Sequence, residues 1–158
     1  MASSQPMSGS PNGGHVRVDA TRLWGGGLAT ACVASLVAVV GVLVFGAVIG
    51  VSLVRPALLL NVADTFTADY ALTAFLLGLL ATAVAHVLAL TTPRPRLFLS
   101  WIVGLATVAG VAAPFAIGSV LESQAATACI NLCLGVCVLS LLRGVMSRTV
   151  SIGAGRTP

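Results

Sequence analysis

Four long stretches of the chain contain almost no charged residue, and polar or charged junctions separate them. They cover residues 23–54, 70–91, 97–118 and 124–145. A helix needs about 20 apolar residues to cross the hydrocarbon core of a bilayer. The pattern therefore predicts an all-α fold, a transmembrane bundle of four helices.

The two ends of the chain differ from this pattern. Residues 1–21 are rich in Ser, Gly and Pro and have no apolar period, and residues 147–158 form a shorter segment of the same kind. Such segments cannot bury enough apolar surface to order themselves. We expect two disordered tails around one transmembrane domain over residues 22–146.

Local signals predict where the first helix ends and where the second begins. Arg55 precedes Pro56, and the residue before a proline avoids the α region, so the first helix should stop there. Asp69 or Thr67 is the expected N-cap of the second helix, because a short polar side chain can accept a hydrogen bond from a free N–H of the first turn.

Arginines cluster at every second junction, and short cytoplasmic loops of membrane proteins are rich in Arg and Lys. Four crossings also place both termini on one face. We therefore expect both termini to be cytoplasmic and the protein to lie in a bacterial inner membrane. Seven arginines fall on the side of the termini, and one, Arg55, falls on the other: the seven are Arg17, Arg22, Arg94, Arg96, Arg143, Arg148 and Arg156.

Composition agrees with a chain that faces lipid. Hydrophobic residues make up 58% and charged residues 8% of the 158 positions, whereas about 25% of an average soluble domain is charged. The net charge of +4 comes from arginines that flank apolar segments singly or in pairs. This spacing indicates topology signals, so we expect the bilayer as partner and no nucleic acid.

Small residues repeat every fourth position and predict where helices pack, since close backbone approach holds helices together in lipid. Thr30, Ala34 and Ala38 form one such row. A GxxxG dimer face on the first helix is the alternative to internal packing. The other packing positions that we predict are Gly46, Gly50, Gly110, Cys129, Cys133 and Cys137.

Two residues inside the apolar stretches disturb them. Pro114 should kink the third helix, because it lacks an N–H and crowds the carbonyl of Gly110 four residues earlier. The kink could form a hinge or a pocket, or be an ordinary membrane proline. Asn131 needs a hydrogen-bond partner in an apolar setting, and the partners that we expect are threonines: Thr73, Thr82 or Thr107.

His86 is, apart from the cysteines, the titratable side chain expected inside the hydrocarbon slab, and such groups are functional candidates. It could relay a proton or contact a ligand, or be a neutral interfacial residue. A further hypothesis is a metal or thiol site formed by His86, Cys137 and Cys32. The alternative is that the cysteines act as small hydrophobic residues where helices pack. No CxxC or HxxH spacing supports the site, so we expect no metal and no cofactor.

No Ser/His/Asp set, phosphate-binding glycine loop or HExxH occurs, so we expect no enzyme. The first functional hypothesis is association, as a homo-oligomer or as a small subunit of an inner-membrane complex. The alternative is a carrier or channel for a neutral or apolar solute, with Pro114, Asn131 and His86 around a cavity. The thiol or metal site is the weakest hypothesis.

Several short strings give the segment order a resemblance to a known family. They are the Arg-Leu-Trp start at 22–24, the apolar run at 75–81, Trp101, Ala-Pro-Phe at 113–115 and Ala-Cys-Ile-Asn-Leu at 128–132. From Arg22 to Arg148 the chain resembles a family of small actinobacterial four-helix integral membrane proteins of unknown function. That resemblance implies the same fold, and the family supplies no activity.

Overall fold

Four long helices make up most of the structure, a computed structural model that describes residues 20–54, 65–116 and 120–149. They are α1 (Ala20–Val42), α2 (Phe66–Thr91), α3 (Pro95–Ala112) and α4 (Leu121–Thr149). The described residues contain no strand. All four helices are long and apolar enough to cross a membrane, by length and composition, so the predicted all-α four-helix fold is confirmed.

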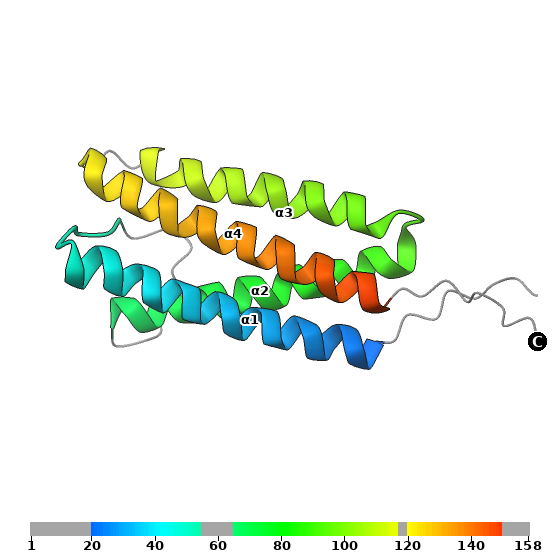
Figure 1. The fold of residues 1–158 in the computed structure, drawn as a ribbon. Helices are drawn as coiled ribbons and strands as arrows, with labels where there is room; N and C mark the ends of the chain where they lie inside the picture. Colours follow the sequence, from blue (N-terminus) through cyan, green and yellow to red (C-terminus); the bar gives the residue numbers. More distant parts are fainter. Residues whose placement is uncertain (1–19, 55–64, 117–119, 150–158) are drawn as a thin grey trace, which may run out of the picture.

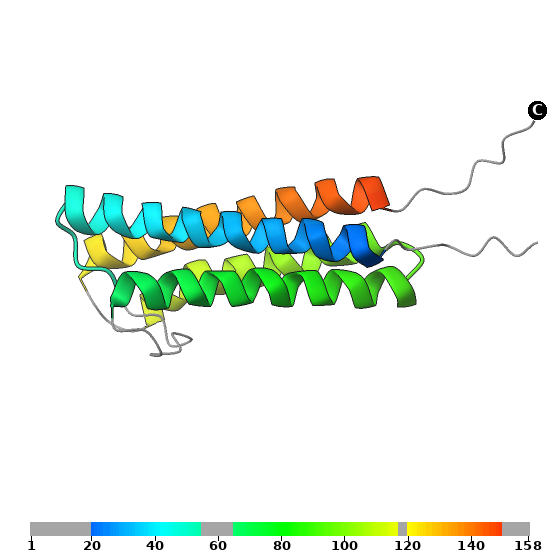
Figure 2. The same cartoon turned by 90° about the horizontal axis from the view of Figure 1, so that it is seen from below.

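The helices lie antiparallel in chain order, and the start of α1 and the end of α4 meet at one end of the bundle (Figure 1). We call this the arginine end, because it carries Arg22, Arg94, Arg96 and Arg143, and we call the opposite end the far end. Helix α1 packs on α2 and α4, and α3 packs mainly on α4. Figure 2 shows α1 lying along α2 over the whole length of the bundle.

The first helix ends earlier than predicted. Its last turn, Leu43–Val48, is a π-helix, in which the Ile49 N–H donates to the Val44 carbonyl over 3.0 Å. Gly50 then adopts a φ of +77°, a left-handed conformation that suits glycine and closes many helices. The prediction that the helix continues to residue 54 was therefore wrong, because a glycine stops it before Arg55 and Pro56 are reached.

Helix α2 begins earlier than predicted, and its N-cap is neither Asp69 nor Thr67. Thr65 has an extended backbone, and its hydroxyl accepts a hydrogen bond from the Ala68 N–H over 3.4 Å. Thr65 therefore makes Phe66 the first residue of α2 and places Thr67 and Asp69 within its first turn. The predicted end at residue 91 is confirmed.

The last two helices keep the predicted order, with shifted ends. Pro95 stands in the first turn of α3, where its fixed φ suits a helix start. The α-helix ends at Ala112 and continues as a 3-10 turn, η2 (Ala113–Ala116). Helix α4 runs from Leu121, three residues before the predicted start, to Thr149, four beyond the predicted end. Most of the two predicted tails, and Arg55 with Pro56, lie outside the described residues.

One predicted row of small residues is an internal seam. Thr30, Ala34 and Ala38 on α1 are buried. Ala31, the residue after Thr30, lies against α2: a Cβ added to Gly78 of α2 would lie 2.9 Å from the Cα of Ala31. The backbones of α1 and α2 approach each other closely here, as small residues allow in lipid.

Other predicted rows face outward. Gly46 is exposed, and a Cβ placed there would have no neighbour within 4 Å. Gly50 is exposed and lies beyond the helix. Cys129 and Cys133 are exposed, and Cys137 is half-buried. The seam on α4 uses a different row, since Gly135 lies against Thr107 of α3. The prediction that Gly46, Gly50, Cys129 and Cys133 pack inside the bundle was wrong, because helices apolar on every side give no period that distinguishes a core face from a lipid face.

Candidate functional site

Asn131 joins three helices near the far end. The Tyr70 hydroxyl on α2 donates to Asn131 Oδ1 over 2.6 Å. Asn131 Nδ2 donates to the Gly110 carbonyl on α3 over 2.7 Å. Both ends of the amide therefore have a partner, which a polar group in an apolar environment requires.

The Gly110 carbonyl is available to Asn131 because of Pro114. In an α-helix this carbonyl would accept from the N–H four residues later, and a proline has none. The N–H of Ala113 donates to Ala109, so it does not take the place of the missing donor. Pro114 is buried in the 3-10 turn. The side chain of Asn131 thus supplies from α4 the hydrogen bond that Pro114 removes from α3.

The expected threonine partners of Asn131 were wrong. Thr73, Thr82 and Thr107 donate to carbonyls four residues earlier in their own helices, over 2.7–2.9 Å. A threonine hydroxyl on a helix can reach the carbonyl four residues earlier in its own helix, and this local bond competes with an interhelical one. The partner that was missed is Tyr70, the only tyrosine of the chain. A lone phenol that opens an apolar helix is a signal that could have identified it.

More polar side chains are buried at the far end, near this polar node, by which we mean Asn131 and its partners Tyr70 and Gly110. The Thr127 hydroxyl donates to the Ser123 carbonyl over 2.9 Å and accepts from the Val54 N–H over 3.1 Å. This bond attaches the segment after Gly50 to α4. Asp69 and Gln124 are also buried and take part in interactions of their own. The far end therefore has a polar interior.

His86 lies near the other end of the bundle, beside Trp24. The two ring centroids are 6.3 Å apart and the planes are inclined by 57°. Its Nδ1 atom is buried without a hydrogen-bond partner among the described residues. His86 follows Tyr70 by 16 residues in one helix, about 24 Å along its axis. The structure therefore does not bring His86 and Asn131 together.

The cysteines do not form the cluster that the sequence suggested. Cys32 is exposed on α1, and Cys129 and Cys133 are exposed on α4. No three His, Cys, Asp or Glu side chains in the described part of the chain are placed to hold a metal ion. The set of His86, Cys137 and Cys32 is therefore not assembled.

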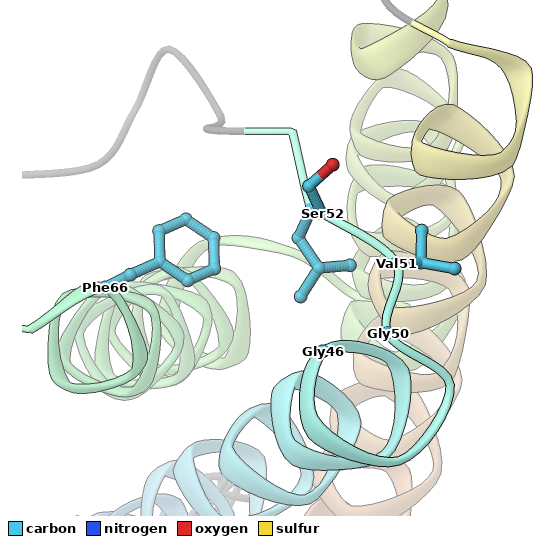
Figure 3. Close-up of a pocket in the computed structure, with 6 residues that line it drawn as sticks. Gly46, Gly50, Val51, Ser52 and Phe66 are labelled. Atoms are coloured by element: carbon cyan, nitrogen blue, oxygen red, sulfur yellow. The ribbon is translucent and has the colours of Figure 1, made fainter.

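An open hollow of about 430 Å³ lies at the far end. Figure 3 shows Phe66, in the first turn of α2, across from Ser52 and the last turn of the first helix. The remaining lining comes from Gly46, Gly50, Val51 and Leu53. Neither His86 nor Asn131 nor Pro114 borders it, so it is not the cavity that the carrier hypothesis requires.

Four apolar helices around an interhelical amide indicate a multi-pass membrane protein. The chain belongs to the family described as "Family of unknown function (DUF6069)", whose match covers residues 18–148. The predicted resemblance to a family of unknown function is thus confirmed. No curated protein and no solved structure matches the chain.

Proposed function

We propose that the protein is a non-enzymatic, multi-pass protein of a bacterial inner membrane that acts by association, as a homo-oligomer or as a small subunit of a larger complex. The arginine-rich end lies in the cytoplasm in this proposal, because short cytoplasmic segments favour arginine. Both termini are then cytoplasmic.

The observation that carries the proposal is a row of small residues on α4 that none of the helices described in the structure covers. Ala125, Cys129 and Cys133 follow one another at four-residue spacing and are exposed. Rows of small side chains let a second helix approach the backbone closely, and van der Waals contact then drives association in lipid. Gly46 adds a further exposed small residue on the neighbouring helix, near the far end.

The polar residues support a structural role over catalysis or transport. Asn131 and Tyr70 bond to each other and to the α3 backbone. A carrier for a neutral solute would need these groups and His86 around one cavity, and the length of α2 separates them. We therefore favour association over the carrier alternative.

Oxidative crosslinking tests the proposal with cysteines that the chain already carries. Variants that keep a single cysteine, Cys133 or Cys32, are oxidised in native membranes. Both thiols are exposed, but Cys32 lies on α1, away from the row. We expect a disulfide-linked dimer, or a linked partner protein, from the Cys133 variant and much less from the Cys32 variant.

Native mass spectrometry in mild detergent gives the second readout. Association predicts a dimer or a complex that Cys133→Leu weakens, since a bulky side chain separates the helices. Cys32→Leu, the same substitution at an exposed position on α1, is the matched control. A strictly monomeric, partnerless species, or equal crosslinking of both single-cysteine variants, contradicts the proposal.

A further inference from the structure

The charged side chains of the bundle are divided between its two ends. Arg22, Arg94, Arg96 and Arg143 are exposed at the arginine end. The acidic residues in the described part of the chain, Asp69 and Glu122, lie in the first turns of α2 and α4, at the far end. The arginine end therefore has an excess of positive charge.

Two of these guanidinium groups occupy neighbouring helices. Arg96 Nη2 donates to the Met146 carbonyl over 3.1 Å, so its side chain extends from α3 to the last turns of α4. Arg143 precedes Met146 by one turn. A guanidinium has five N–H donors, so Arg96 keeps donors for another acceptor. It also lies at the negative end of the α4 dipole, which holds it in place.

Both tryptophans of the chain lie near this end and face outward. Trp24 is 45% exposed and Trp101 is 65% exposed. Trp101 follows Arg96 by five residues, about 7.5 Å along α3. Tryptophan rings favour the headgroup level of a bilayer. Arg96, beyond Trp101, therefore lies at the level of lipid phosphates, and the long side chain of Arg143 can extend to that level.

We infer that Arg96 and Arg143 bind the phosphate of an anionic phospholipid, whose acyl chains lie along α3 beside Trp101. Guanidinium groups match the oxygens of a phosphate through paired, charge-assisted hydrogen bonds. A lipid phosphate is also the anion that the membrane itself supplies at this depth. An anionic lipid is preferred over a zwitterionic one because no choline group then opposes the two arginines. The inference requires that the chain crosses a membrane and does not depend on its association.

Tryptophan fluorescence tests the inference, because both tryptophans report on this end alone. The full chain is reconstituted with brominated phosphatidylglycerol or brominated phosphatidylcholine, whose bromines quench nearby tryptophans. The variant Trp24→Phe leaves Trp101 as the reporter. We expect at least about fivefold selectivity for phosphatidylglycerol, since one basic residue near an anionic surface alone gives about that factor. Trp101→Phe, which leaves Trp24, should give a weaker selectivity.

Charge variants locate the effect. The double variant Arg96→Gln with Arg143→Gln should abolish the selectivity reported by Trp101, and Arg96→Lys with Arg143→Lys should retain most of it. Glu122→Gln, a charge change at the far end, should leave it unchanged. Circular dichroism confirms that each variant keeps its helices. Equal quenching by both lipids, or selectivity that survives the glutamine variant, overturns the inference.

Discussion

The two halves of the bundle are stabilised by different interactions. Near the arginine end Leu23, Ala85, Leu99, Leu142 and Met146 are fully buried. The buried hydroxyls of this half, on Thr30 and Thr82, donate to carbonyls of their own helices and join no two helices. The far half buries polar residues between its helices, among them the Tyr70–Asn131 pair. It also contains each departure from α-helical geometry among the described helices, the π-helix and the 3-10 turn.

This difference shows what irregular backbone requires in a membrane. Where the helices are regular, each backbone group bonds within its own helix, and packing of apolar side chains is sufficient. Where a helix is interrupted, the freed groups must find partners inside the protein because lipid offers none. Asn131 supplies one for Gly110, and Thr127 supplies one for the Val54 N–H.

The largest expected effect is in the apolar half. Leu142→Ala removes a fully buried side chain and should lower the free energy of unfolding by about 3 kcal/mol, the usual result of a cavity in a packed core. Leu141→Ala is the matched control, since Leu141 is exposed. Unfolding in SDS titrations measures both. An equal loss in the two variants would show that this core is not packed as described.

The second largest loss of stability is expected from a substitution at the contact between α1 and α2. In Gly78→Ala the new methyl group meets the Ala31 backbone, so the two helices must move apart, at about 2 kcal/mol. Gly104→Ala on α3 has no neighbour within 4 Å and should leave the stability unchanged or slightly higher. The same titration compares the two. If Gly78→Ala does not lower the stability, α1 and α2 do not approach each other closely at Gly78.

In the polar half, Asn131→Leu should destabilise by about 1–2 kcal/mol. The leucine keeps the number and branching of the side-chain heavy atoms but leaves the Gly110 carbonyl and the Tyr70 hydroxyl without partners. Interhelical hydrogen bonds contribute about 0.6–1.7 kcal/mol each. Thr73→Val is the control, because Thr73 bonds within its own helix. If both substitutions have the same effect, Asn131 does not join the helices.

The smallest expected effect is that of Tyr70→Phe, at about 0.6 kcal/mol. It removes the bond from α2 and leaves the bond from Asn131 to Gly110 in place. Hydrogen exchange should therefore increase in the first turns of α2 and remain unchanged in α3 near Gly110. Increased exchange in both helices would mean that the amide depends on the phenol to hold its position.

The helices could be predicted from the sequence better than their contacts could. Lipid and protein core are both apolar, so length reveals a crossing, but no polar face shows how the helix is rotated. For that reason the row with Cys129 and Cys133 was placed inside the bundle, although both residues face outward. Thr30, Ala34 and Ala38 were placed correctly.

The polar node was predicted in parts and not as a whole. The sequence indicated that Pro114 frees the Gly110 carbonyl and that Asn131 needs a partner. It could not indicate that the Gly110 carbonyl accepts a hydrogen bond from Asn131, because that depends on how α3 and α4 align. Tyr70 was missed for the same reason, since 61 residues separate it from Asn131.

A double-mutant cycle of Asn131→Leu and Pro114→Ala tests this pairing most directly. Alanine at position 114 restores the N–H that the Gly110 carbonyl lacks, so the loss of Asn131 should then matter less. We predict that Asn131→Leu destabilises the Pro114→Ala background by about 1 kcal/mol less than it destabilises the wild-type protein. Additive effects, equal within about 0.3 kcal/mol, would contradict the pairing of the amide with the proline.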